Sequence, residues 1–288
     1  MRRENYYSVT KIDDYVYRLN SQENVAIDVF VGTQNVLVFD TGNGFGDLRG
    51  TIATISNLPP IVVNSHGHFD HANGNYQFSD CPIYMNERDW WIHELFCTAK
   101  ERATLVEESK RAMVAWDQEE PCNILPEDFD EEAYINCPAS QLQNIQDGMV
   151  FALGNGITLR VIETPGHTAG SICLLREETG ELYVGDSINR NLLLAFFNAP
   201  LEDYLASLGK LQQLPYKRLL PAHTNDWIER EEVDLLVDAI LHPDRENCKK
   251  VSPPNNPEVE SYLYVRKGYT MADSNQWGYF SFIVDHML

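Results

Sequence analysis

NSHGHFDHANG, residues 64–74, decides how this chain is interpreted, because it places three of the eight histidines within six positions. His66 and His68 are two positions apart, so in an extended loop both side chains point the same way and can reach one ion. Asp70 and His71 follow where we expect the chain to turn into a helix, and they point elsewhere. Imidazole nitrogen and carboxylate oxygen are ligands that zinc, iron and manganese accept. The stretch predicts a metal site, with a metal-free hydrogen-bonded cluster as the alternative.

Three further residues with side chains that can bind a metal each follow another predicted strand. His167 lies in TPGHTAGS, Asp186 in YVGDS and His223 in LPAHTND, while the first cluster follows the apolar run 61–63. Loops at strand ends are where rigid sheets usually carry binding groups. Seven candidate ligands exceed the four of one tetrahedral zinc and suit two ions that share a carboxylate. A metal-free cluster would leave costly unpaired polar groups, and a purely structural zinc site usually contains cysteine.

The rest of the chain alternates β-rich and helical patterns. We expect strands on both sides of Gly32-Thr33, a hairpin at Asn155-Gly156 and a second hairpin around Gly180. Asn86 is expected to cap one long helix over 87–116, because that stretch lacks glycine and proline. Residues 117–147 are acidic and contain three prolines, so we expect irregular structure there. The other predicted elements are helices in 201–214 and 230–241, a strand in 217–225, and late β segments in 261–271 and 277–287.

Composition narrows the classes of partner. The net charge of -21 argues against nucleic acid, whose binding depends on basic patches. No apolar run approaches the ~18 residues of a membrane span, and the N-terminal arginines precede polar residues rather than a secretory signal. The six cysteines are scattered without a C-x-x-C pair, which favours free thiols. We therefore expect a cytoplasmic protein with no nucleic-acid or membrane partner.

The motifs SHGHFDH, TPGHTAGS, VGDS and PAHT, in that order, resemble those of the metallo-β-lactamase superfamily. The resemblance spans residues 12–245 approximately and implies an α+β fold, the four-layer αββα sandwich. We expect a single metallo-hydrolase domain over residues 1–288. It would carry a helical or irregular insertion at about 86–147 and an aromatic C-terminal extension at about 250–288.

The resemblance also implies roles for individual residues. Two divalent metal ions are implied, with zinc expected first and iron or manganese as alternatives. Asp186 would bridge the two ions, and Asp40 in VLVFDTG would support the metal-binding loop. Asp70 is in addition a candidate catalytic residue that accepts a proton or orients the nucleophile. The implied ligands are His66, His68 and His167 for the first ion, and Asp70, His71 and His223 for the second.

The expected activity is hydrolysis of a small-molecule ester, thioester or lactone by a metal-bridging hydroxide. Asp186 stands where the best-known zinc β-lactamases have cysteine, and it resembles glyoxalase II, the acyl-homoserine lactonases and the phosphodiesterases. Asn189 replaces the tyrosine of the lactonases, and the aromatic tail differs from the helical region of glyoxalase II. The alternatives are a persulfide dioxygenase-like oxidoreductase with one iron, and a phosphodiesterase. A degenerate scaffold is disfavoured because all seven ligand positions are kept.

Several apolar segments allow two interpretations. Residues 89–96, 191–200 and 262–280 would line a substrate pocket, or they would form ordinary core or a subunit interface, and we favour core or interface over the pocket. A homodimer through the aromatic C-terminal segment stays open. His93, His242 and His286 are expected to be ordinary residues, and Cys173 to be buried packing.

Overall fold

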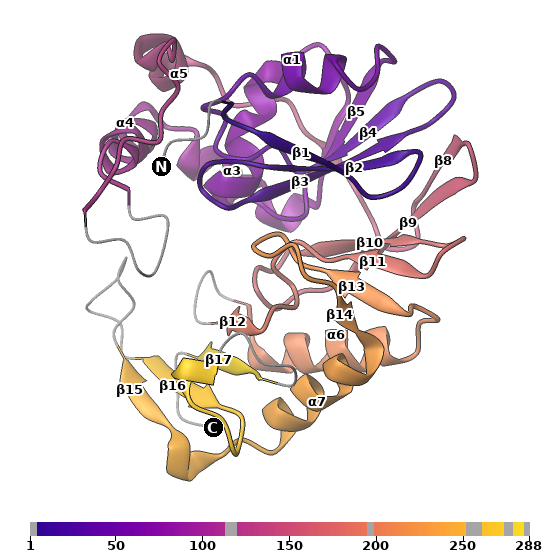
Figure 1. Ribbon diagram of the computed structural model, residues 1–288, viewed down its shortest axis with the longest axis vertical. Helices are drawn as coiled ribbons and strands as arrows, with labels where there is room; N and C mark the ends of the chain where they lie inside the picture. The colour runs from indigo at the N-terminus through magenta and orange to yellow at the C-terminus, as the bar shows by residue number, and fades with distance from the viewer. Residues whose placement is uncertain (1–4, 113–119, 195–198, 252–260, 274–278, 285–288) are drawn as a thin grey trace.

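The computed structural model describes residues 5–112, 120–194, 199–251, 261–273 and 279–284. The described residues form three β-sheets with short helices between and outside them (Figure 1). Within these ranges, no helix combines the length and the apolar character that crossing a membrane requires. The expectation for His286 lies outside the described residues.

The first sheet has its strands in sequence order, which makes it the simplest part of the fold. Its first four strands are antiparallel neighbours, and the strands from β4 onward are parallel. All four residues of β4, VLVF, are buried, as expected for a strand that is covered on both faces. The strands are β1 (Ser8–Lys11), β2 (Val16–Asn20), β3 (Ala26–Val31), β4 (Val36–Phe39), β5 (Pro60–Val63), β6 (Ile83–Met85) and β7 (Gln143–Asn144).

The second sheet is mostly antiparallel, in the order β14-β13-β11-β10-β9-β8. Asn155 and Gly156 both have positive φ, 53° and 68°, as a two-residue turn of a β-hairpin requires, and Gly180 has φ 74° before β11. Both predicted hairpins are confirmed. The strands are β8 (Val150–Gly154), β9 (Ile157–Glu163), β10 (Ile172–Arg176), β11 (Glu181–Tyr183), β13 (Arg218–Leu220) and β14 (Ile228–Glu229).

A third, smaller sheet joins one strand from the middle of the chain to three late ones, in the order β12-β17-β16-β15. β12 (Asn191–Leu193) pairs parallel with β17 (Ser281–Val284), while β16 (Ser261–Val265) pairs antiparallel with β17 and with β15 (Lys249–Val251). The late β segments predicted from the aromatic pattern are therefore confirmed where the structure describes them.

The prediction of one long helix over 87–116 is wrong. Asn86 does act as a cap, because its side chain accepts a hydrogen bond from the N–H of Arg88. The helix then breaks at Cys97, and the extended Thr98 caps a new helix by accepting from the N–H of Glu101. The observed segments are η2 (Glu87–Asp89), α3 (Trp90–Phe96) and α4 (Ala99–Ser109). The predicted end at Trp116 lies outside the described residues.

The expectation of irregular structure over 117–147 is also wrong in part. Asp130 caps a short helix by accepting from the N–H of Ala133, and a two-residue strand completes the first sheet. These elements are α5 (Glu131–Asn136) and β7. The remaining helices are α1 (Leu48–Ala53), α2 (Phe69–Ala72), α6 (Leu201–Gln212), α7 (Arg230–Leu241), η1 (Asn73–Phe78), η3 (Arg245–Asn247) and η4 (Met271–Asp273).

Three apolar clusters hold these layers together. One lies between the two large sheets and includes Phe30 and Phe39 from the first and Leu159 from the second. Another joins the first sheet to α1, and the largest joins the second sheet to α6, α7 and the third sheet. The arrangement is an αββα sandwich, with α1 outside the first sheet and α6 and α7 outside the second (Figure 1). The predicted fold class is confirmed.

Candidate metal centre

Loops at strand ends from both large sheets bring all seven predicted ligands together. His66 and His68 follow β5, and α2 begins directly after His68, which turns Asp70 and His71 away from that pair. The other three residues lie between β9 and β10, after β11 and after β13. Alternating short strands and loops thus deliver residues that are far apart in sequence to one place, as their positions after strands predicted.

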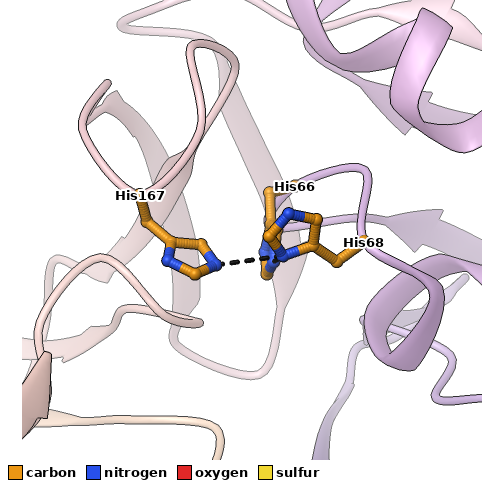
Figure 2. A group of neighbouring side chains, drawn as sticks. All are labelled: His66, His68 and His167. Carbon is orange, nitrogen blue, oxygen red and sulfur yellow. Dashed lines mark hydrogen bonds between the residues drawn. The ribbon is translucent and has the colours of Figure 1, made fainter. Parts of the chain in front are cut away.

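The first group consists of His66, His68 and His167. Nδ1 of His68 lies 3.0 Å from Nε2 of His66 and 3.0 Å from Nε2 of His167. Figure 2 shows the three rings converging from the two loops. The two distances are short enough for hydrogen bonds, but Nδ1 of His68 carries at most one proton and can donate to only one of the two rings. Three nitrogens that converge in this way fit a shared cation better than a hydrogen-bonded cluster.

The second group consists of Asp70, His71 and His223. Oδ2 of Asp70 lies 3.5 Å from Nε2 of both His71 and His223. These three residues can hold an ion with ligand atoms that lie within 4.8 Å of one another. Carboxylate and imidazole ligands of this kind suit zinc, iron and manganese alike.

Asp186 lies between the two groups. Its Oδ2 is 3.2 Å from Nε2 of His223, 3.5 Å from Nε2 of His71 and 3.6 Å from Nε2 of His167. The same carboxylate oxygen therefore reaches a ligand of the first group and two of the second. Nε2 of His71 and Oδ1 of Asp186 are buried and make no hydrogen bond within the described residues. Such unpaired buried atoms are costly unless a cation satisfies them, and the site fits two metal ions on this count.

The charges of two first-group histidines and of both carboxylates suit metal binding, whereas the facing carboxylates outweigh burial and raise the pKa of His71 and His223. Burial lowers the pKa of His68 to about 3 and the pKa of His66 well below its usual value, and the neighbouring histidines add to both effects. Burial raises the pKa of Asp70 and Asp186, but the facing histidines outweigh it and hold both below the usual range. Neutral imidazoles and ionised carboxylates are the forms that bind metal.

Asp40 contacts the loop that carries the first cluster. Its Oδ1 accepts from the N–H of Ser65 at 2.6 Å, and its Oδ2 lies 2.8 Å from Oγ of Ser65 and 2.8 Å from Nδ1 of His71. A hydrogen bond to Nδ1 leaves Nε2 of His71 as the free ligand atom. Asp40 adopts φ 68°, a conformation that non-glycine residues seldom adopt and that concentrates at functional sites.

His167 is held by the third sheet. Its Nδ1 lies 2.9 Å from the carbonyl oxygen of Leu193 in β12, which leaves Nε2 to face the other ligands. Segment 191–200 therefore contacts the site through its main chain as far as the structure describes it. Residues 195–198 lie outside the described residues.

An aromatic pair from segment 89–96 and α2 stands beside the first group. The Phe96 ring lies 6.3 Å from the His68 ring, and the Phe69 ring lies 5.1 Å from the Phe96 ring. Leu95 is 42% exposed and Trp91 is 47% exposed on α3. Apolar side chains therefore adjoin the polar centre, which is the usual composition of a small-molecule site.

Two buried charged residues that support the ligand loops were missed by sequence reasoning. Asp89 accepts hydrogen bonds from Gly67 and Gly170, which lie on the two loops of the first group. Arg18 donates to the carbonyl oxygens of Pro221 and Thr224 on either side of His223. Neither residue lies in a recognisable motif. Cys173 is buried as expected, and His93, expected to be an ordinary surface or core residue, is buried beside Cys97.

The comparisons with known proteins point to one superfamily. The model of the metallo-β-lactamase superfamily matches residues 103–223, a range that includes His167, Asp186 and His223. The acyl-coenzyme A thioesterase MBLAC2 of Homo sapiens is 26% identical over 213 residues, which cover 72% of this chain and 71% of the relative. The atrochrysone carboxyl ACP thioesterase AgnL7 of Paecilomyces divaricatus is 34% identical over 99 residues, 33% of this chain and 30% of the relative.

A solved structure has the same fold. A metallo-β-lactamase family protein of Thermus thermophilus superposes with a TM-score of 0.54 at 20% identity, covering 76% of this chain and 75% of that one. At this identity, the likeness concerns the arrangement of sheets and helices and not the activity.

Proposed function

The chain belongs to the metallo-β-lactamase superfamily and is a hydrolase, and from that premise we propose that it cleaves acyl thioesters at a centre of two divalent metal ions. The observation that carries the proposal is the position of Asp186, whose Oδ2 lies within 3.6 Å of ligand atoms in both groups. The thioester is chosen because two relatives are named as thioesterases, one for acyl-coenzyme A and one for an acyl carrier protein.

We propose that each group holds one ion and that Asp186 is shared by the two. His66, His68 and His167 would hold the first ion, and Asp70, His71 and His223 the second. Ions bound there supply a nucleophile from water at neutral pH and polarise the scissile carbonyl. Zinc is the proposed metal because the first group consists of three imidazoles, with iron and manganese as the outcomes that would replace it.

The chain's own residues then orient the substrate. The Asp70 side chain is 19% exposed, so its carboxylate can accept a proton from water or hold that water in line with the carbonyl. Phe96 and Phe69 offer an apolar surface to the acyl group beside His68. A thiolate is a good leaving group, so no side chain has to protonate it before the bond breaks.

We further propose that the chain is one catalytic domain over 1–288 with an insertion at about 86–147 and an extension at about 250–288. Helices α4 and α5 lie beside the sandwich rather than within its layers, which supports the insertion (Figure 1). The third sheet packs on the second through the largest apolar cluster, which supports the extension. All six cysteines are free thiols, in keeping with the proposed cytoplasmic location. A homodimer stays a prediction.

Elemental analysis and substrate assays on protein purified without added metal test the proposal. We expect two zinc ions per chain, hydrolysis of a short acyl-coenzyme A, and slower turnover of matched oxygen esters and lactones. Oxygen uptake is measured in parallel with a persulfide as the substrate, and a phosphate diester is added to the substrate panel. One iron per chain with oxygen uptake would replace thioester hydrolysis by the dioxygenase activity, and faster cleavage of the phosphate diester would replace it by the phosphodiesterase activity.

A further inference from the structure

Asp89 lies between the two loops that carry the first group of histidines, and its side chain is completely buried. It is the last residue of η2, directly before α3. One loop is the stretch His66-Gly67-His68, and the other begins at His167. Asp89 is not itself part of either group of candidate ligands.

The Asp89 carboxylate accepts hydrogen bonds from both loops. Oδ2 accepts from the N–H of Gly67 at 3.0 Å and from Oγ1 of Thr168 at 2.5 Å. Oδ1 accepts from the N–H of Gly170 at 2.7 Å. Gly67 stands between His66 and His68, and Thr168 follows His167 directly, so two of the three bonds act on a direct neighbour of a histidine of the first group, and the third acts on the loop of His167.

Only a carboxylate matches this set of donors. Three donors face two oxygens, and an amide in the same place would turn an N–H₂ group toward at least one of them. Within the described residues, no lysine, arginine or histidine lies within ion-pair distance of Asp89, so the hydrogen bonds stabilise its charge. An unpaired buried carboxylate would be expensive, and this one is kept where two ligand loops meet.

The glycines of the two loops fit the same interpretation. A Cβ at position 67 would lie 2.6 Å from the carbonyl oxygen of Asp89, and a Cβ at position 170 would lie 2.6 Å from Cγ of Asp89. Both loops can therefore approach Asp89 only because these positions carry no side chain. The contact is too close to be incidental surface packing.

We propose that Asp89 is a positioning residue that fixes the His66-His68 loop relative to the His167 loop and thereby sets the affinity and geometry of the first metal position. The inference rests on the proposed function for the presence of the metal. Asp89 supports the first position only, because within the described residues it makes no hydrogen bond to Asp70, His71 or His223.

Cobalt(II) titration of the metal-free protein tests this role. Wild-type protein is expected to bind two equivalents, and competition with a chelator gives the affinity of each. In Asp89→Asn the first, all-histidine position should weaken by about 10- to 100-fold and its visible absorption should change, while the other position keeps its affinity. Thr168→Val should weaken the same position less, and Thr168→Ser, which keeps the hydroxyl, should restore wild-type binding.

Glu181→Gln is the matched control. Glu181 is a buried acid that accepts from Arg176, Arg218 and Thr179 and contacts none of the candidate ligands. The Glu181→Gln variant should be less stable than the wild-type protein, but its cobalt titration should be unchanged. If Asp89→Asn and Thr168→Val bind both equivalents like wild type, the positioning role is overturned and the proposed function stands. If wild-type protein itself binds no cobalt, the proposed function is overturned together with it.

Discussion

The two halves of the candidate metal centre are supported by buried charges of opposite sign. Asp89 holds the loops of the first group, whereas Arg18 holds the His223 loop of the second. Arg18 is 1% exposed, donates to the carbonyl oxygens of Pro221 and Thr224 and to Oδ1 of Asn225, and pairs with Asp28. The loops of the first group direct main-chain N–H groups at Asp89, and the His223 loop directs main-chain carbonyl oxygens at Arg18. N–H groups require a buried anion and carbonyl oxygens a buried cation, so the main-chain groups that a loop directs into the core decide which charge can hold it.

The halves also differ in exposure. In the first group His66 is 1% and His167 5% exposed and His68 is partly buried, while in the second group His71 is buried and the His223 side chain is 32% exposed. The second group also contains a carboxylate of its own. We therefore expect the first position to be the less accessible one and the second to be the one that meets substrate and exchanges its ion more readily.

The largest expected effect comes from the residue that the halves share. Asp186→Asn should lower kcat/KM by about 10⁴-fold, equivalent to about 5 kcal/mol, because it weakens both metal positions. His223→Ala should remove only the second equivalent. Metal stoichiometry and steady-state kinetics distinguish the two, with Asp238→Asn on the exposed end of α7 as a control that changes neither. Retention of the first equivalent alone in Asp186→Asn would show that Asp186 is not shared.

The next effect isolates the support of the second half. Arg18→Leu leaves Asp28 buried without its partner, so the free energy of unfolding should fall by about 4 kcal/mol. The second cobalt equivalent should weaken and the first should not, the reverse of Asp89→Asn. Arg176→Leu, which breaks a buried pair with Glu181 elsewhere, should lose stability alone. Equal weakening of both cobalt equivalents in Arg18→Leu would show that Arg18 does not support the second group selectively.

The contributions of Asp28 and His93 to the stability of the protein should change with pH in opposite directions. Burial raises the pKa of Asp28, the partner of Arg18, to about 6, although Arg18 opposes the shift. The native state then holds a proton that the unfolded chain releases, and stability is lost as the pH rises from about 4 to about 6. Burial, with help from Arg102, lowers the pKa of His93 on α3 to about 4. The unfolded chain then holds the extra proton, and stability is gained as the pH rises from about 4 to about 6.5.

Each contribution amounts to about 3 kcal/mol at most, so the two largely cancel in the wild-type protein. Urea unfolding at several pH values should show Asp28→Asn gaining stability, relative to wild type, as the pH rises from 4 to 6.5. His93→Gln should show the opposite trend. The same trend in both variants would mean that groups other than Asp28 and His93 govern the pH dependence of stability.

The smallest effect concerns the residue between the halves. Oγ of Ser65 lies 2.9 Å from Nδ1 of His66 and 2.8 Å from Asp40, so it contacts a ligand of the first group and the residue that orients His71 of the second. Ser65→Ala should cost about 1 kcal/mol, which is about 5-fold in the affinity for the first cobalt equivalent. Ser65→Thr keeps the hydroxyl and serves as the comparison. A loss confined to the second equivalent would place the contribution of Ser65 with Asp40 and His71.

The sequence predicted the candidate ligands because each follows a strand, and strand ends of a sandwich meet at one edge. It missed Asp89 because an acid near the start of a helix is usually a cap or a solvated side chain. It missed Arg18 because one charged residue in a strand carries no sign of which loop it will meet more than 200 residues later. The helix break at Cys97 was missed because neither glycine nor proline causes it, although Thr98 followed three residues later by Glu101 is a pair typical of a helix N-terminus. Motifs report local geometry, whereas these supports depend on contacts between distant segments.

The hydrogen bond from His167 to Leu193 has a consequence for the timing of synthesis. Leu193 belongs to β12, and the register partner of Leu193 in β17 is Ile283, about 90 residues later. At translation rates of about 5–20 residues per second, β12 waits for its neighbouring strand for roughly 5–20 s. From the synthesis of His223 to the end of that interval, the newly made chain contains all seven candidate ligands, but the carbonyl that orients one of them lies on a strand without its partner. The ribosome therefore delivers the histidines first and the scaffold that orients His167 last.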